Sequence, residues 1–286
     1  MNSLGFNKKE NDTKVIVAMS GGVDSSVAAV KLKMEGYDVT GVTLRLYNQP
    51  NSSKSKSCCA GIDINDAKKV AEQYDFPHKV FDYQDKFFNG VISNFVDSYA
   101  NGETPVPCIQ CNQTVKFSDL LEESKKINAD ALVTGHYAIR KGGLRGSKLF
   151  KAKDKIKDQS YFLFATLQDQ LDYVRFPLGN YLKSEIRQLA NDYKLVVSDK
   201  PDSQDICFVT SDSYRDLINK LQPEINKEGN IFDNDGNKIG VHKGIANYTV
   251  GQRKGVGVGG QDQPLYVKEV NKDQNFIVLA PLQNLQ

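Results

Sequence analysis

The 286-residue sequence has little excess charge of either sign, because 37 Lys and Arg residues stand against 35 Asp and Glu residues. No overall positive field attracts nucleic acid, so a nucleic-acid partner needs a local basic surface. Long hydrophobic runs are also lacking: residues 15–19 fall far short of the ~20 residues that span a bilayer. The polar residues 1–13 contain no signal-peptide hydrophobic region, so we expect a cytoplasmic protein.

Cysteine is scarce as well, and its five copies argue against a disulfide framework, because the number is odd and Cys58 adjoins Cys59. In a reducing compartment, the Cys-x-x-Cys spacing of Cys108 and Cys111 more often serves a metal or redox chemistry. Buried structural cysteines, with Cys207 in the core beside an aromatic residue, are the alternative. We assign Cys58 and Cys59 no chemistry.

The pattern of apolar residues predicts alternating strands and helices. Residues 14–19 are continuously apolar and β-branched, as in a strand buried on both faces of a parallel sheet. A helix over 27–34 and a strand over 39–46 complete a βαβ unit. Further helices are predicted over 64–74, 87–99 and 115–127, and further strands over 79–81 and 131–134. We therefore expect a doubly wound, mostly parallel α/β sheet.

The alternation of predicted strands and helices ends near residue 208. A hairpin is predicted around Asp235 and Gly236, followed by strands over 265–270 and 276–279. The sequence thus predicts an α/β domain over residues 1–208 and a small β-rich domain over 209–286. Within the latter, residues 255–260 (GVGVGG) match a dinucleotide-binding glycine pattern. They open no predicted helix, so we interpret them as a loop.

The first predicted strand ends in a glycine-rich turn, residues 20–26 (SGGVDSS), which leads into a helix. Small residues let main-chain amides approach an anion, and the helix N-terminus adds free N–H groups and a positive dipole. The turn is no Walker A loop, because no Gly-Lys-Ser/Thr ends it. An ordinary strand-to-helix turn is the alternative, but the complete string is more specific than a bare Gly-Gly pair.

Six motifs occur in the order seen in bacterial tRNA-specific 2-thiouridylases, and the resemblance runs from about residue 14 to 279. The motifs are SGGVDSS, TPVPCIQCN (104–112), TGHY (134–137), KDQSY (157–161), SQDICF (203–208) and YTVGQRKG (248–255). These enzymes belong to the N-type ATP pyrophosphatases and have an adenine nucleotide alpha hydrolase-like fold. The resemblance implies that residues 1–208 form the ATP-pyrophosphatase catalytic domain. It implies that 209–286 form a small central domain and the start of a C-terminal β-barrel.

The resemblance implies ATP-dependent 2-thiolation of the wobble uridine in tRNAs for Lys, Glu and Gln. ATP, with Mg²⁺ linked to Asp24, adenylates the C2 carbonyl oxygen, and sulfur then replaces AMP. The implied ATP-binding residues are Ala18, Met19, Ser20, Gly21, Gly22, Val23, Asp24, Ser25, Leu44 and Gly135. The implied tRNA-binding residues are Val106, Pro107, Cys108, His136, Lys157, Asp158 and Gln159. The implied partners are tRNA and a sulfur donor protein, either a sulfur relay protein or a cysteine desulfurase.

The resemblance also gives the cysteines roles: Cys207 carries the persulfide, and Cys111 releases the sulfur by forming a disulfide. A helix N-terminus after Cys108 and Cys111 is expected to lower the thiol pKa. Cys108 departs from the better-known pattern, in which an aspartate with an acid/base role precedes the second cysteine by three positions. Cys108, Cys111 and Cys207 could instead hold three irons of a [4Fe-4S] cluster, which we prefer because a third thiol is an oxidative liability without an evident persulfide role. Zinc is less favoured, since only three histidines are present.

Two other functions remain open at this point. A synthetase that adenylates a small metabolite needs no group of three cysteines, and a sulfur-carrying binding protein leaves the glycine-rich turn unexplained. In the second domain, Gln252, Arg253 and Lys254 form a basic cluster that is either solvated surface or a secondary tRNA contact. Relatives are expected to continue into a further β-barrel domain, so we expect this chain to be a truncated form or a naturally minimal enzyme.

Overall fold

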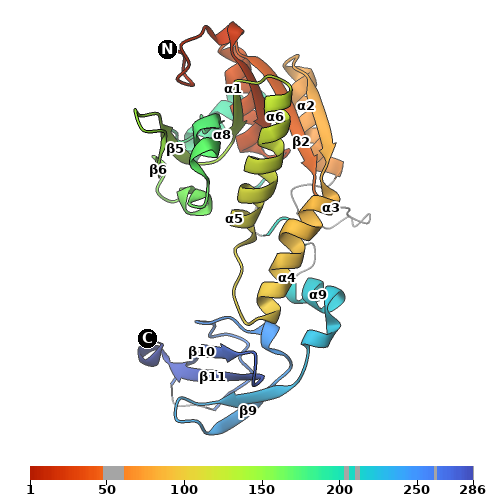
Figure 1. Cartoon of the computed structure of the whole chain (residues 1–286), viewed down its shortest axis with the longest axis vertical. Coiled ribbons are helices and arrows are strands. Elements are labelled where there is room, and N and C mark those ends of the chain that lie inside the picture. The colour runs from red at the N-terminus through yellow and green to blue at the C-terminus, as the bar shows by residue number, and fades with distance from the viewer. Residues whose placement is uncertain (48–60, 203–205, 210–212, 261–262, 286) are drawn as a thin grey trace. The chain divides into compact units, whose positions relative to one another are not determined.

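The computed structural model describes residues 1–47, 61–202, 206–209, 213–260 and 263–285. Cys58 and Cys59, with the polar segment before them, lie outside the described residues. By its contacts the chain divides into two compact units, each traced in Figure 1. The first unit comprises residues 1–90 and 108–210, and the second comprises residues 91–107 and 211–286. Each unit is described by itself below.

The first unit is built on a parallel sheet with the strand order β3-β2-β1-β4-β7. All registered neighbours in this sheet run parallel, which confirms the predicted doubly wound α/β class. The predicted strand over 131–134 is observed with those bounds. The strands are β1 (Lys14–Ala18), β2 (Asp38–Arg45), β3 (His78–Asp82), β4 (Ala131–Thr134) and β7 (Val174–Arg175).

Helices cover both faces of this sheet. Helix α1 (Val23–Met34) contacts α2 (Gly61–Gln73) and α8 (Lys183–Asp192) on one face. Because crossovers between parallel strands are right-handed, α6 (Leu120–Lys126), which leads back across the sheet into β4, lies on the other face, and Figure 1 shows it crossing in front of the strands. The remaining helices and the hairpin strands of this unit are α3 (Gln84–Phe87), α5 (Pro107–Cys111), α7 (Gln168–Tyr173), β5 (Ala138–Lys141) and β6 (Lys148–Lys151).

The centre of the first unit explains why β1 is continuously apolar. Val15, Ile16 and Val17 are all fully buried, because helices pack against both faces of this central strand. The core that surrounds them continues into α1, where Val27 and Val30 are also fully buried. This packing fixes the position at which β1 ends and the glycine-rich turn begins.

The second unit contains a sheet with the strand order β10-β11-β8-β9. The predicted hairpin is confirmed, with Gly236 in its turn at a φ of +86°. Residues 255–260 precede a strand and open no helix, as expected. The elements are α4 (Ser93–Ala100), α9 (Tyr214–Leu221), β8 (Gly229–Phe232), β9 (Lys238–His242), β10 (Leu265–Asn271) and β11 (Phe276–Pro281). In the described part of the chain, no helix is long and apolar enough to cross a membrane.

Candidate active site

The candidate active site lies where the strand order of the parallel sheet reverses. From β1 the chain moves outward to β2 and β3, then returns to the other side of β1 as β4. The carboxyl ends of β1 and β4 are level, because Ala18 pairs with Thr134. Open α/β sheets bind ligands at this point. The glycine-rich turn after β1 therefore lies beside Gly135 and His136, which follow β4.

Two glycines permit the close packing of this turn. Gly21 has a φ of +72°, and a Cβ atom there would lie 2.2 Å from the main-chain oxygen of Asp63. A Cβ atom on Gly135 would lie 2.9 Å from the amide nitrogen of Ser25. Gly22 is the N-cap of α1 and provides no side-chain cap. The first amides of α1 therefore receive no side-chain cap, which is the arrangement that the predicted anion site requires.

The remaining predicted nucleotide-binding residues support the turn from behind. The amide of Ser20 donates to the hydroxyl of Ser25 over 3.1 Å, which closes the turn. Met19 and Val23 are 2% and 4% exposed, so their side chains belong to the core. Ala18 ends β1, and Leu44 lies near the carboxyl end of β2. These residues can meet a nucleotide mainly through their main chains or at the strand ends.

Asp24 is tied to the protein itself. Its carboxylate accepts from the ammonium of Lys183 at 2.6 and 2.7 Å and from the Tyr137 hydroxyl at 2.8 Å. Burial and the neighbouring Asp24 carboxylate raise the pKa of Tyr137, which therefore stays protonated as a donor. Both carboxylate oxygens are thus bonded to Lys183, and the Mg²⁺-linked role of Asp24 stays a prediction.

A chain of ion pairs extends from Asp24. Lys183 also contacts Asp202 at 2.9 Å, and Lys157 contacts the same carboxylate at 2.9 Å. Arg187 provides a third cation for Asp202 at 2.5 Å. Burial alone raises the pKa of Asp202, but hydrogen bonds from Lys157 and Lys183 outweigh it and lower the pKa well below the ordinary value. Asp202 is thus a fixed negative charge between three cations.

Lys200 holds the opposite side of the turn. Its ammonium donates to the carbonyl oxygen of Gly21 at 2.9 Å and to the carboxylates of Asp63 and Asp66 at 2.5 and 2.8 Å. Burial lowers the pKa of Lys200, but the two carboxylates more than compensate and raise it above the ordinary value. Lys183, Lys200 and Asp202 were not predicted from sequence, because no local pattern links them to residues 20–25.

His136 is held as a neutral ring at the carboxyl end of β4. Its Nδ1 atom lies 2.7 Å from the Thr134 hydroxyl, and Phe117 and Phe176 each meet the ring edge-on at 6.1 Å between ring centres. Burial, with a smaller effect of the Lys116 charge, lowers the pKa of His136 to about 3. A neutral imidazole can make hydrogen bonds or stack at neutral pH, but it carries no positive charge there.

The predicted tRNA-binding residues after β6 are hydrogen-bonded to the segment that follows β4. The side-chain oxygen of Gln159 accepts from the main-chain amide of Tyr137 at 3.0 Å, and the main-chain amide of Gln159 donates to the carbonyl oxygen of Tyr137 at 2.8 Å. Asp158 accepts from the amide of Ala152 and the hydroxyl of Ser160, both at 2.7 Å. Lys157 pairs with Asp202, as described above. Gln159 thereby connects this segment to the residue after His136.

Two of the predicted catalytic cysteines lie inside a helix rather than before one. Helix α5 begins at Pro107, since proline suits the first position of a helix, and it ends at Cys111. The chain then continues as a π-helical segment over Asn112–Asp119. Cys108 is exposed, whereas Cys111 is only 7% exposed. Burial raises the pKa of Cys111, so the expected lowering of its pKa is wrong.

The predicted contacts next to these cysteines differ from each other in burial. Val106 is 36% exposed, and the next residue, Pro107, is buried. Beyond Cys111, the amide of Asn112 donates to the carbonyl of Phe162 at 3.1 Å, close in sequence to the KDQSY motif. The π-helical segment after α5 and the segment after β6 are therefore joined through this side-chain amide.

Cys207 belongs to the same unit as the glycine-rich turn and Cys111. Its carbonyl oxygen accepts from the hydroxyl of Tyr47, which follows β2 near the ligand-binding edge of the sheet. The next residue, Phe208, is 5% exposed and meets Phe87 edge-on at 5.6 Å between ring centres. The Cys207 thiol is half-buried. The Tyr47 and Phe87 contacts thus fix the main chain around this cysteine.

The three cysteines do not fit the predicted iron-sulfur cluster. Among the residues that the structure describes, no three Cys, His, Asp or Glu side chains are grouped closely enough to hold a metal ion. Cys108, Cys111 and Cys207 all belong to that described part. We therefore derive no chemical step through a cluster.

Two family models together match most of the chain. The first, described as a tRNA methyl transferase HUP domain, matches residues 13–211. The second, described as a tRNA methyl transferase PRC-barrel domain, matches residues 216–281. With the parallel sheet and the glycine-rich turn of residues 20–26, which we call the anion-binding turn after its predicted role, these matches define an adenine nucleotide alpha hydrolase-like protein followed by a β-rich part.

The chain is similar to longer bacterial enzymes. The tRNA-specific 2-thiouridylases of Dinoroseobacter shibae and Paracoccus denitrificans are 52% and 53% identical over 287 residues. All of this chain is covered, against 75% and 74% of those proteins. The chain belongs to the tRNA-specific 2-thiouridylase family. A weaker likeness, with a TM-score of 0.44 and 14% identity, is to a 4-thiouridine synthetase in complex with RNA and ATP, over 74% of this chain and 51% of that one.

Proposed function

We propose that this protein uses ATP to convert the wobble uridine of tRNAs for Lys, Glu and Gln to 2-thiouridine. One observation carries the proposal: the anion-binding turn and Cys111 and Cys207 belong to the same compact unit of a chain in the 2-thiouridylase family. The turn predicts phosphate chemistry, and the two cysteines predict sulfur chemistry. We further propose that the enzyme works in the cytoplasm with a protein that donates sulfur.

The first step is adenylation of the uridine. The O2 atom of the base attacks the α-phosphorus of ATP, the bond from that phosphorus to the bridging oxygen breaks, and pyrophosphate leaves. Main-chain amides of residues 22–25 face the developing negative charge at the start of α1. Lys183 and Lys200 keep the turn in the required shape from either side. Magnesium commonly accompanies ATP through the phosphates, but no step here depends on a protein ligand for it.

The second step is sulfur transfer by way of a persulfide, which we prefer to a cluster because the described cysteines form no metal-binding group. The terminal sulfur on Cys207 attacks C2 and displaces AMP. The Cys111 sulfur then attacks the Sγ atom of Cys207, the sulfur–sulfur bond to the base breaks, and 2-thiouridine leaves. A Cys111–Cys207 disulfide remains, and a thiol reductant returns it to two thiols.

The burial of Cys111 bears on this second step. Because burial raises its pKa, Cys111 is a thiol at neutral pH and must lose a proton as it attacks. Cys108, exposed and three residues earlier on the same helix, replaces the aspartate of better-known relatives. We propose that Cys108 stands where the aspartate of relatives acts, and that the Cys111 proton passes to the thiouridine sulfur as the sulfur–sulfur bond breaks. The reactive thiolate then forms only where the sulfur is to be released.

The tRNA contacts we propose are Val106, Pro107, Cys108, His136, Lys157, Asp158 and Gln159. Their support is that His136 follows β4 at the carboxyl edge of the sheet, while Gln159 is hydrogen-bonded to the adjacent Tyr137. A neutral imidazole suits an uncharged base better than a phosphate. The target uridine must leave its stack to reach a cysteine, as in other enzymes that modify bases.

The test is formation of 2-thiouridine in purified, unmodified tRNA with ATP and a persulfide donor. Cys207→Ala and Cys111→Ala are each expected to abolish thiolation, while tRNA-dependent pyrophosphate release continues because adenylation comes first. Pyrophosphate release without tRNA would instead indicate a synthetase that adenylates a small metabolite. Thiolation at the unaltered rate in either variant would remove that cysteine from the mechanism.

A further inference from the structure

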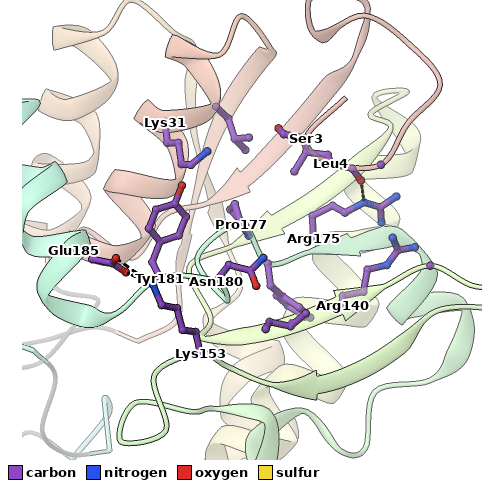
Figure 2. A pocket seen from close by; sticks show the side chains of 15 residues that line it. Ser3, Leu4, Lys31, Arg140, Lys153, Arg175, Pro177, Asn180, Tyr181 and Glu185 are labelled. Atoms are coloured by element: carbon purple, nitrogen blue, oxygen red, sulfur yellow. Dashed lines mark hydrogen bonds and ion pairs between the residues drawn. The ribbon is translucent and has the colours of Figure 1, made fainter. Parts of the chain in front are cut away.

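A cavity of about 550 Å³ lies in the first unit, away from the anion-binding turn (Figure 2). Residues near the N-terminus, the second half of α1 and the segments around β5 and β7 line it. None of residues 20–25 takes part. Its lining residue Leu32 follows Val23 by nine positions along α1, which corresponds to about 14 Å at the rise of a helix. The cavity is therefore distinct from the proposed nucleotide site.

The lining of this cavity is strongly basic. Lys31, Arg140, Lys153 and Arg175 line it, and Glu185 is the acidic residue among the lining side chains. The two lysines are already neutralised, because Lys153 pairs with Glu185 at 3.1 Å and Lys31 pairs with Glu35. The positive charge that remains belongs to the two arginines.

Both arginines are held in place by main-chain oxygens. Arg175 is only 7% exposed. Its Nε atom donates to the carbonyl oxygen of Leu4, and its Nη1 atom donates to the carbonyl oxygen of Asp172, both at 2.8 Å. Arg140 donates to the carbonyl of Leu171 at 3.1 Å and also to that of Asp172, at 2.9 Å. Within the described residues, neither guanidinium forms an ion pair, and Nη1 of Arg140 and Nη2 of Arg175 donate no hydrogen bond.

The two guanidinium groups lie next to each other, as Figure 2 shows. Burial, and to a smaller extent the charge of Arg140, lower the pKa of Arg175 to about 10. Asp172 opposes this effect, but its carboxylate already accepts from the amide of Ser147 at 2.7 Å and from Gln168 at 3.2 Å. Two cations are thus brought together at a cavity without a carboxylate bound to either.

We propose that this cavity is a second anion-binding site, in which Arg140 and Arg175 bind the phosphate group of a ligand. Each guanidinium has one nitrogen whose N–H groups remain for phosphate oxygens, Nη1 of Arg140 and Nη2 of Arg175, and a phosphate would neutralise the two neighbouring charges. The volume lies within the range of small-molecule sites, and Phe176 and Tyr181 add aromatic surface to the lining. The phosphate comes either from a small phosphate ester or from the tRNA backbone.

The experiment titrates inorganic phosphate into the protein by calorimetry while a non-hydrolysable ATP analogue saturates the anion-binding turn. Arg140→Gln is the test variant, and Arg145→Gln, exposed on the same hairpin and absent from the cavity lining, is the matched control. We expect one bound phosphate in the unaltered protein and in the control, and at least a tenfold weaker affinity in Arg140→Gln. Arg140→Lys keeps the charge but loses the paired donors, so we expect an intermediate affinity.

The same variants are then compared in tRNA binding, with thermal unfolding as the check that each is folded. A tenfold loss of tRNA affinity in Arg140→Gln but not in Arg145→Gln would assign the site to the tRNA backbone. Unchanged tRNA affinity together with weakened phosphate binding would assign it to a small phosphate ester. The proposal is overturned if the unaltered protein binds no phosphate under these conditions, or if Arg140→Gln binds it equally well.

Discussion

The carboxylate of Asp24 accepts from the ammonium of Lys183 at 2.6 Å, although 159 residues separate them in sequence. Asp24 belongs to the first turn of α1 and Lys183 to the first turn of α8. Because Lys183 also contacts Asp202 at 2.9 Å, one ammonium joins two carboxylates from different parts of the unit. The negative charge of Asp24 is thereby neutralised at the start of the helix that is to receive an anion.

Replacing Lys183 should weaken nucleotide binding and stability together. Lys183→Met leaves Asp24 and Asp202 without their shared cation, so we expect the free energy of unfolding to fall by about 2 kcal/mol, less than for a fully buried pair. We also expect ATP affinity to fall at least tenfold, since an unpaired carboxylate would then repel the phosphates. Chemical denaturation and calorimetry measure the two effects.

Lys68→Met is the control for Lys183→Met, because Lys68 and Glu72 form an exposed pair at 3.6 Å that should contribute about 0–1 kcal/mol. ATP affinity unchanged in Lys183→Met would show that the ion pair serves the fold alone.

Gly21→Ala should distort the anion-binding turn. The alanine would have both an unfavourable φ of +72° and a Cβ atom 2.2 Å from the Asp63 oxygen. We expect ATP binding to be lost and the midpoint of urea unfolding to decrease. Gly36→Ala is the matched control, since Gly36 has a φ of +95° but its added Cβ would come no closer than 3.8 Å to Glu10. The control should lose about 1–2 kcal/mol from the backbone conformation alone and keep its ATP affinity. Equal effects of both substitutions would contradict the close-packing argument.

The neutral His136 predicts a particular dependence of stability on pH. Its pKa is about 3 in the folded protein and about 6.5 in an unfolded chain, so the unfolded state takes up the proton first as pH falls. The contribution of His136 to stability is therefore complete above pH 6.5 and is lost as pH falls toward 3. Between these values the free energy of unfolding should change by up to about 1.4 kcal/mol per pH unit on account of this residue.

Denaturation of the unaltered protein and of His136→Gln between pH 7 and pH 4 measures this dependence. The variant should lose the component of the slope that corresponds to one proton. Parallel curves for the two proteins would show that the pKa of His136 is the same in the folded and unfolded states. His242, whose pKa is also lowered by burial, is present in both proteins and cancels in the comparison.

Cys108 separates the two sulfur chemistries. In the persulfide route Cys108 only occupies the acid/base position of relatives, so Cys108→Asp should keep at least a tenth of the thiolation rate, whereas Cys108→Ala should lose most of it. Protein prepared without iron should be as active as protein treated anaerobically with iron and sulfide. Visible iron-sulfur absorption that disappears in Cys108→Ala together with activity would restore the cluster hypothesis.

The sequence alone predicts best the parts of the fold that depend on local pattern. Residues 14–18 and 131–134 become strands because a central parallel strand is apolar throughout. The glycine-rich turn was also recognisable, since Gly21 adopts a conformation that other residues rarely take. The alternation of strands and helices also predicts that the turn lies at the carboxyl edge of the sheet, where β1 and β4 end side by side.

The parts that could not be predicted depend on contacts between distant residues. Lys200 reaches the carbonyl of Gly21 across 179 positions, and nothing in the local sequence indicates that contact. The environment of Cys111 was also inaccessible: a helix N-terminus suggests a lowered pKa, but burial within α5 raises it. Local pattern gives the charge of a side chain but not the depth at which it is buried.

The two lysines that hold the anion-binding turn have a consequence for synthesis of the chain. A ribosome that has released only the first 134 residues has produced β1, the whole turn and β4, yet neither Lys183 nor Lys200 has been made. Asp24 then lacks its bond from Lys183, and the carbonyl oxygen of Gly21 lacks its hydrogen bond from Lys200. A nascent chain therefore cannot hold the turn in the form that the folded protein has until Lys200 has emerged.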